Sequence, residues 1–309
     1  MTVMSTEVEQ SEVRALTTAQ PEGGATGGPT VLRMLLGAHL RRLREAQGVS
    51  REDAGWEIRS SESKISRMEL GRVGFKERDI EDLLTLYGVD DPEERARLMT
   101  LARDANNPGW WHRFGDVLPG WFQSYLGLEA AASLIRTYEV QFVPGLLQTK
   151  EYAQAVVQLG HRRAPMEEID RRVSLRLARQ QILTRTDPPQ LWAVVDEGAL
   201  RRPIGGPGVI RGQIEALIEA TKLSNVRLQV IPFQAGGHAA AGGSFTILRF
   251  PAPDLPDVVY IEQLTSALYL DKRDDVDHYA AAMERLCIEA DPPNHTAEVL
   301  DEILRDHGK

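Results

Sequence analysis

Hydrophobic residues recur at helical spacing between residues 33 and 105. Leu36, Leu40 and Leu43 follow an i, i+4, i+7 pattern, which places them on one face of a first helix. Later apolar groups predict a fourth and a fifth helix, and Asp91-Pro92 supplies the cap and first position of the fifth. These groups are Ile80, Leu83, Leu84 and Tyr87, followed by Leu98 and Leu101. Five short helices over this length are enough for a self-sufficient bundle.

The residues after the first helix predict a second, short helix with a defined start. Ser50 is a natural N-cap, and Asp53 three residues later completes a weak capping box. Ala54, Gly55 and Ile58 then fall on one face at helical spacing. Because Ala54 and Gly55 are small, we expect a neighbouring helix to approach closely at this pair.

A third helix follows after a tight turn. Ser60 and Ser61 end the second helix and offer a cap for the next one. Ile65 and Met68 turn one face of this helix inward, and Gly71 lies just past its end, where a left-handed residue is commonly required. Two short helices joined in this way predict a helix-turn-helix, a motif that places its second helix in the DNA major groove.

The segments LRRLREAQGVSREDAG and SKISRMELGR resemble the XRE (xenobiotic response element) family, relatives of the phage repressors. The resemblance implies that the helix beginning near Ser61 is the recognition helix. It also implies an internal ion pair between Arg44 and Glu69. The chain departs from the family pattern in the turn, where Arg59 replaces a usual Gly and Ser60 replaces an aliphatic residue.

The polar side chains of the predicted recognition helix form a candidate DNA-binding surface. Arg67 could make a bidentate contact to guanine O6 and N7, the commonest specific base contact. Glu62 could accept a hydrogen bond from a cytosine amine, or it could orient Arg51, which reaches in from the preceding helix. The other candidates suit phosphate oxygens and are Ser61, Ser63, Lys64, Arg72 and Lys76. The alternative is a solvated charged face on a bundle that binds only protein.

Composition shifts along the chain predict its division into domains. Residues 1–32 are rich in Thr, Glu, Gly and Ala without an apolar period, which predicts a flexible tail rather than a partner-binding arm. The helix-turn-helix domain is expected over 33–105, followed by a connector at 106–123 that holds Trp110, Trp111 and Trp121. We expect these tryptophans to pack one domain on another, or else to line a pocket.

The rest of the chain predicts an α+β or mixed α/β body over 124–290 and a C-terminal helix or tail over 291–309. Residues 124–180, including GLEAAASLIRTYE, have a helical texture, and the pattern then changes to strands with a crossover helix between the first two. The predicted strands are 191–195, 226–233, 243–250, 258–264 and 267–270. The Gly-rich segment AGGHAAAGGSF predicts a long hairpin loop between the second and third of these. The fold class is therefore multidomain, a five-helix phage-repressor-like bundle followed by this body.

The body also resembles a known family. Segments such as WFQSYLGLEAAASLIRTYE, VPGLLQTKEYA and VRLQVIPFQAGGHAAAGGSFTILRF are similar to a domain of unknown function that follows the helix-turn-helix in antitoxin-like actinobacterial regulators. The resemblance implies a regulator that is often encoded beside a small partner protein. It leaves the chemistry of the body open.

Bulk properties narrow the class of protein. No apolar run approaches the length of a membrane span, no secretory signal is visible, and the single cysteine, Cys287, fits a reducing cytoplasm. The net charge of -9 is unusual for a DNA-binding protein, but residues 33–78 hold 11 Lys+Arg against 7 Asp+Glu. A modestly basic module on an acidic body is compatible with specific, salt-sensitive DNA binding.

Little in the sequence favours an enzyme. Asp196, His238 and Ser244 could be drawn as a catalytic triad, but there is no G-x-S-x-G elbow. The seven histidines are scattered without metal-ligand spacing, and no phosphate-binding loop is present, so we expect no metal and no cofactor. The sequence predicts a protein that is not an enzyme.

Three roles remain for the body, which are effector sensing, partner binding and dimerisation. Candidate residues for a sensing pocket are Trp110, Trp111, Trp121, Arg136, Tyr138 and Glu262. Partner binding could use the strand VVYIEQL as an exposed sheet edge. We expect a homodimer on a pseudo-palindromic DNA operator, because one short half-site gives little specificity. The alternative is an antitoxin-like or adaptor protein that acts mainly through a small partner protein.

Overall fold

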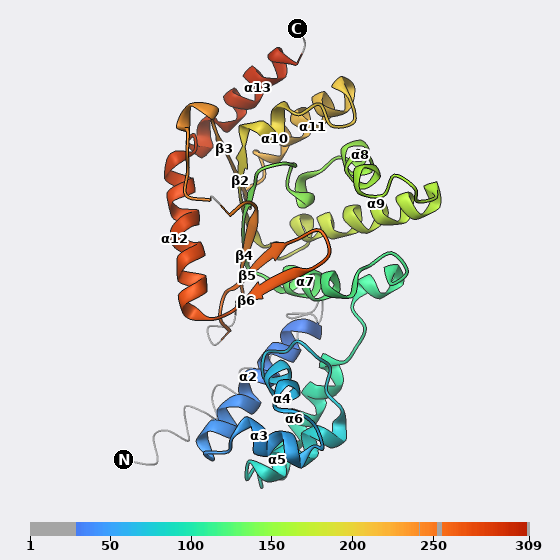
Figure 1. Cartoon of the computed structure of the whole chain (residues 1–309), viewed down its shortest axis with the longest axis vertical. Helices are drawn as coiled ribbons and strands as arrows, with labels where there is room; N and C mark the ends of the chain where they lie inside the picture. Colours follow the sequence, from blue (N-terminus) through green and yellow to red (C-terminus); the bar gives the residue numbers. More distant parts are fainter. Residues whose placement is uncertain (1–28, 241, 252–254, 308–309) are drawn as a thin grey trace. The chain divides into compact units, whose positions relative to one another are not determined.

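The computed structural model describes residues 29–240, 242–251 and 255–307, and the chain divides into two compact units between Gly109 and Trp110. Figure 1 labels the helices and strands of both units. Of the flexible tail predicted over residues 1–32, residues 1–28 lie outside the described residues. Its last four residues were predicted wrongly, because the first described helix already begins at Pro29. None of the helices in the described part of the chain is long and apolar enough to cross a membrane.

The described residues of the first unit form the five predicted helices. They are α2 (Pro29–Ala46), α3 (Arg51–Glu57), α4 (Glu62–Glu69), α5 (Glu77–Leu86) and α6 (Pro92–Ala105). The caps are those that the sequence indicates, since Ser50 Oγ accepts a hydrogen bond from the Asp53 amide at 3.0 Å. Leu36, Ile65 and Leu84 lie in a continuous apolar core at the centre of the bundle.

A glycine that sequence reasoning missed lets α2 approach α4. A Cβ atom at Gly37 would lie 2.6 Å from the Glu69 carbonyl oxygen and still closer to that of Met68. Gly55, which we had expected at such a contact, instead approaches the turn, where a Cβ would lie 3.0 Å from the Ser60 carbonyl oxygen. The backbones of α2 and α4 are therefore in direct contact only because position 37 has no side chain.

A buried carboxylate joins three of the helices. Glu69 at the end of α4 is 2% exposed and receives Arg44 of α2, with 2.5 Å between Arg44 Nε and Glu69 Oε1. Its second oxygen, Oε2, lies 3.0 Å from Nε of Arg51 on α3. Arg44 also donates to the Val49 carbonyl oxygen at 2.8 Å, which fixes the end of α2. The predicted Arg44–Glu69 ion pair is confirmed, and Arg51 extends it into an Arg–Glu–Arg triad.

The turn between α3 and α4 has an unusual backbone. Arg59 has φ of +53°, and it is the one residue other than glycine with positive φ in the described part of the chain. The Ser60 amide closes the turn by donating to the Gly55 carbonyl oxygen at 2.8 Å. The departure noted in the sequence therefore falls at the position where a left-handed backbone is needed. Gly71 after α4 has φ of +64°, as predicted.

The described residues of the second unit form one six-stranded mixed sheet in the order β3-β2-β1-β4-β5-β6. The strands are β1 (Leu134–Glu139), β2 (Gln190–Asp196), β3 (Val226–Ile231), β4 (Phe245–Arg249), β5 (Val258–Glu262) and β6 (Ala267–Leu270). β1, β2 and β3 are parallel, whereas β4, β5 and β6 continue the sheet antiparallel to their neighbours. The predicted crossover between β2 and β3 is confirmed, with α11 (Pro207–Ala220) as its helix.

The central strand of this sheet was predicted wrongly as part of a helix. The helical texture of GLEAAASLIRTYE ends at Ala132, whose extended backbone leads directly into β1. Ile135 and Thr137 then face one side of the sheet, while Tyr138 faces the other. β1 is a strand because β2 and β4 pair with it on both sides, and that tertiary pairing outweighs the local helical preference.

Two further predictions about the sheet are wrong for the same reason. β3 and β4 do not form a hairpin, because β3 pairs with β2 and β4 pairs with β1. The Gly-rich segment between them therefore carries the chain from one edge of the sheet to its middle. The strand VVYIEQL is not an edge, since β5 lies between β4 and β6, and the edges are β3 and β6.

Helices cover both faces of the sheet (Figure 1). On one face α12 (Arg273–Glu289) packs Met283 and Leu286 against Tyr138 and Val194. The other helices of the unit are α7 (Gly120–Ala131), α8 (Lys150–Gly160), α9 (Met166–Gln180), α10 (Glu197–Arg201) and α13 (Thr296–Asp306). Short 3-10 turns lie at Trp110–Phe114, Gly145–Leu147, Gln181–Thr184, Phe233–Ala235 and Pro293–His295.

The Trp-rich segment belongs to the second unit and packs within it. Trp111 is buried against Phe114, Leu126 and Leu175. Arg171 of α9 holds the same segment by donating from Nε to Asp116 Oδ2 at 2.7 Å. Trp111 therefore serves as a packing residue inside the body.

We expect Glu69→Gln to lower the free energy of unfolding of the first unit by about 3–5 kcal/mol, because it leaves two guanidinium groups without their shared counter-charge. Hydrogen exchange of the α2 and α4 amides in the full chain measures this change. Glu77→Gln is the matched control, because Glu77 pairs with Arg103 at 3.0 Å on the exposed surface, and its loss costs below about 1 kcal/mol. Equal effects of the two substitutions would contradict the role given to Glu69.

We expect Arg59→Gly to raise the stability of the first unit by about 1 kcal/mol, because glycine adopts a left-handed backbone without the steric cost of a side chain. The same change at Arg41, an exposed position inside α2, should lower stability by about 1 kcal/mol. Hydrogen exchange of residues 50–70 in the full chain compares the two variants. A loss of stability in both would show that the turn is not strained at Arg59.

Candidate nucleic-acid interface and the polar interior of the body

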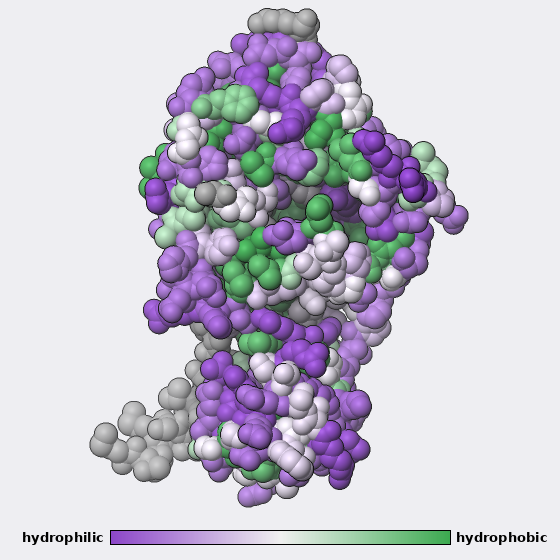
Figure 2. Space-filling model, in the orientation of Figure 1, coloured by the Kyte–Doolittle hydropathy of each residue, from purple (hydrophilic) through white to green (hydrophobic). Residues whose placement is uncertain are grey.

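Helix α4 has one buried and one exposed face, as a recognition helix requires. Ile65 and Met68 are buried in the core of the unit, as the sequence predicts. Glu62, Ser63 and Arg67 are exposed on the other side of the helix. In the view of Figure 2 the surface of residues 29–109 is mainly hydrophilic.

The start of α4 is capped and rigid. Ser61 Oγ accepts a hydrogen bond from the Lys64 amide at 3.3 Å, which confirms Ser61 as the N-cap. The side chains of Glu62 and Ser63 therefore project from the first turn of a fixed helix. Amides at such an end carry partial positive charge and can also face phosphate oxygens.

Arg67 is placed to reach outward from the last turn of α4. It is exposed, and its Nε donates to the Ser63 carbonyl oxygen at 3.3 Å. No acidic side chain among the described residues forms an ion pair with it, so its guanidinium has donors left for a base edge. This geometry fits the bidentate contact proposed from the sequence.

Two of the predicted DNA-contact residues also form ion pairs within the unit. Arg51 pairs with Glu69, so the alternative in which Glu62 orients Arg51 is wrong. Lys64 Nζ lies 2.5 Å from Oδ2 of Asp79 on α5, and that carboxylate is 1% exposed. Lys64 thus fastens α4 to α5, and its charge is already compensated. Sequence reasoning missed both partners because each lies on another helix.

The remaining basic candidates lie just beyond α4. Arg72 is exposed, and its amide donates to the Arg67 carbonyl oxygen at 2.8 Å, so its position follows from the end of the helix. Lys76 is exposed and occupies the cap position of α5. Arg59, which sequence reasoning had treated only as a departure from a pattern, is exposed in the turn that precedes α4. The sequence does carry a sign of this role, because Arg59 stands where the XRE family usually has glycine.

In the body, the three residues of the candidate catalytic triad, Asp196, His238 and Ser244, come only partly together. His238 Nε2 lies 3.9 Å from Asp196 Oδ2 and 3.0 Å from the Tyr138 hydroxyl oxygen. Ser244 does not join them, because its hydroxyl oxygen accepts from the Val140 amide at 3.2 Å. His238 thus fixes the Gly-rich segment over the ends of β1 and β2.

The face of the sheet opposite α12 contains a charged cluster. Arg179 of α9 donates to both carboxylate oxygens of Glu129 on α7, at 2.7 and 2.9 Å. Arg176, one turn earlier, donates to Gln148 Oε1 at 3.0 Å and has no ion pair among the described residues. Glu262 at the end of β5 acts on both arginines electrostatically, and so does Glu139 at the end of β1.

Burial changes the acidity of two members of this cluster. It raises the pKa of the Glu139 carboxyl to about 7, an effect that the Ser244 hydroxyl opposes and the charge of Glu262 reinforces. Burial also lowers the pKa of Arg176 to about 10, and neighbouring Arg179 adds to this effect. The cluster therefore holds charges that are only partly compensated.

The residues expected to line one sensing pocket do not come together. Tyr138 lies on the α12 face of the sheet, whereas Glu262 belongs to the cluster on the opposite face. Trp111 is buried in the packing of the body. The signal that would have found the charged cluster is the pair of arginines at 176 and 179, which are separated by almost one helical turn.

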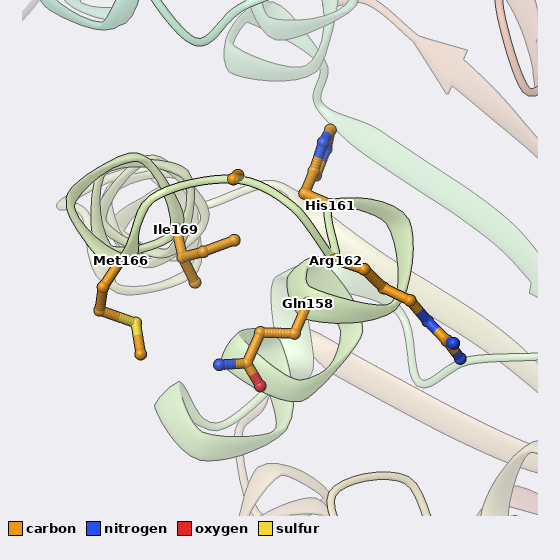
Figure 3. Close-up of a pocket in the computed structure, with 6 residues that line it drawn as sticks. Gln158, His161, Arg162, Met166 and Ile169 are labelled. Carbon is orange, nitrogen blue, oxygen red and sulfur yellow. The ribbon is translucent and has the colours of Figure 1, made fainter.

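A hollow of about 480 Å³ lies between the end of α8 and the start of α9. Gln158, His161, Arg162, Ala164, Met166 and Ile169 line it. Figure 3 shows that the Arg162 side chain points away from Met166, so the polar groups do not converge. His161 and Arg162 are both exposed, and partial desolvation lowers the pKa of His161. Among the described residues no group of three side chains could hold a metal ion, here or elsewhere.

Comparison with known families agrees with this division of the chain. A model for a helix-turn-helix domain matches residues 35–98, and a model for a domain of unknown function (DUF5753) matches residues 122–302. A search of curated proteins finds no match, and neither does a search of solved structures. The N-terminal unit is thus a DNA-binding domain of the helix-turn-helix type. The second match covers more than half of the chain, so the protein belongs to the DUF5753 family and carries a helix-turn-helix domain before that region.

Proposed function

We propose that the protein is a sequence-specific transcriptional regulator that inserts α4 into the DNA major groove. The observation that carries this proposal is the capped helix α4, which buries Ile65 and Met68 and exposes Glu62, Ser63 and Arg67. Arg67 reads guanine, and Glu62 reads cytosine through its amine. The Ser61 end of the helix, with Arg72 and Lys76, contacts phosphates.

In this proposal the protein is an XRE-type regulator that acts in the cytoplasm as a homodimer on a pseudo-palindromic operator. Two half-sites one helical turn apart would supply the specificity that one α4 lacks. We also propose that the body is not an enzyme. In support of this, Ser244 is engaged with the Val140 amide and not with His238.

We assign the body a regulatory role, with sensing of a small-molecule effector as the first candidate. Arg176 supports this role, because a largely desolvated guanidinium with one hydrogen bond has unused donors for an anionic group. A second candidate is antitoxin-like binding of a small partner protein. It is favoured by the edge strand β6 and by the fully exposed Leu264 beside it.

The test of the proposed function is binding of the full chain to genomic fragments at two salt concentrations. We expect one fragment to be preferred and its binding to weaken with salt, as phosphate contacts require. Arg67→Ala should reduce the discrimination between this fragment and single-base variants by about 1–3 kcal/mol. Arg97→Ala, which removes an exposed arginine from α6, is the matched control. If no fragment is preferred at either salt concentration, the proposal fails.

The Glu139 carboxyl gives the body a predictable dependence on pH. Its pKa is about 7 in the folded protein, above the ordinary value of 4.5, so the folded state keeps a proton that the unfolded chain loses. The stability of the body should therefore fall as pH rises from about 4.5 to about 7. Glu139→Gln stays neutral and should be more stable than the parent by about 3 kcal/mol at pH 8, with no difference at pH 4.

Urea unfolding followed by tryptophan fluorescence at both pH values measures this difference. Glu151→Gln is the control, because Glu151 is exposed on α8 and its replacement should have the same small effect at both pH values. A constant difference between Glu139→Gln and the parent across the range would show that Glu139 ionises normally.

A further inference from the structure

Trp56 on α3 is exposed in a way that is unusual for a tryptophan. Its side chain is 78% exposed, against 38% for Trp110. Tryptophan offers one of the largest apolar surfaces of any side chain and is enriched among the residues that dominate protein interfaces. On the opposite face of α3, Ala54, Gly55 and Ile58 are buried, so the orientation of the helix cannot bring Trp56 into the core.

Three carboxylates lie near Trp56 on the exposed side of α3. Glu52 and Asp53 precede it by four and three residues, so their side chains are its neighbours on the helix surface, whereas Glu57 directly follows it and lies further round the helix. All three are exposed. Asp53 accepts a hydrogen bond from Ser50 Oγ at 2.7 Å. Within residues 29–240, 242–251 and 255–307, no basic side chain forms an ion pair with Glu52, Asp53 or Glu57.

The negative charge of this face argues against three kinds of partner, which are DNA, a second copy of the chain and the other parts of the same chain. DNA phosphates would be repelled by three unpaired carboxylates. A second copy of the chain would bring the same acidic face against itself, and like charges in an interface are costly. Residues 1–28 contain four Glu and one Arg, and residues 110–309 contain 26 Asp+Glu against 21 Lys+Arg, so both are acidic. None of these complements the outer face of α3.

We propose that the outer face of α3, formed by Glu52, Asp53, Trp56 and Glu57, is a docking site for a protein segment rich in arginine and lysine. A guanidinium or ammonium group over the indole gains a cation–π interaction, and the flanking carboxylates give it charge-assisted hydrogen bonds. Because α3 packs directly before the DNA-reading helix α4, a partner bound here is held beside the operator. This inference goes beyond the proposed function, which assigns partner binding only to the body.

The probe is a synthetic helical peptide with arginines along one side, titrated into the full chain by calorimetry. Its counterpart with glutamate in place of arginine measures non-specific binding. We expect saturable binding of the arginine peptide alone, weakened at least tenfold by Trp56→Ala. Glu52→Gln combined with Glu57→Gln should weaken it similarly. Asp90→Asn combined with Glu93→Gln removes the same charge from exposed positions elsewhere in the unit and should leave the affinity unchanged.

Equal loss in the control pair would overturn the proposal, because the peptide would then respond only to net charge. Unchanged binding to Trp56→Ala would overturn it too. The same variant is tested for DNA affinity and for sedimentation as a monomer or dimer. A change in DNA affinity would place Trp56 in the DNA interface, and a change in mass would place it between two copies. Trp56→Ala should fold normally, since it removes an exposed side chain and alanine favours helix. Operator binding by the parent chain reports separately on the proposed function.

Discussion

The shared carboxylate of Glu69 is the constraint on which the DNA-binding unit depends. One buried negative charge receives Arg44 from α2 and Arg51 from α3, and it belongs to α4 itself. The relative positions of the two helices of the helix-turn-helix are therefore fixed by an interaction that water cannot easily replace. Close contact of α2 with α4 at Gly37 completes this arrangement. Helix α4 is held from the inside of the unit, and its outer face stays exposed.

This way of holding the helix uses up basic residues. Arg44, Arg51 and Lys64 are all engaged with buried carboxylates, which explains why a formally basic segment presents few unpaired cations. The surface that remains is suited to a small number of directed contacts. Weak general attraction to DNA and the proposed reading by a few residues such as Arg67 would both follow from this packing. They are also consistent with an overall charge of -9.

Local patterns predicted the first unit well because its contacts are local. Helix periodicity, the Ser50 and Ser61 caps and Gly71 are signals that a few neighbouring residues carry. The body was harder, because strand β1 is defined by partners far away in the sequence and not by its own residues. The predicted β3–β4 hairpin and the predicted edge strand VVYIEQL were wrong for that reason.

The site shows the same limit. The Lys64–Asp79 pair joins two helices whose faces cannot be aligned from the sequence alone. Trp56, by contrast, could have been found, since the inward positions Ala54, Gly55 and Ile58 leave it on the outer side of α3. Exposure of a tryptophan was therefore readable from periodicity, whereas ion pairs between helices needed the structure.

The pairing of β1 also sets the order in which the chain matures during synthesis. The apolar core of the first unit is complete at Ala105, but β1 needs β4, which ends at Arg249. Ribosomes add roughly 5–20 residues per second. The DNA-binding unit can therefore complete its fold on the nascent chain about 10–30 s before the central strand of the body has both of its neighbours. A chain interrupted in that interval would carry a finished DNA-binding unit without a completed body.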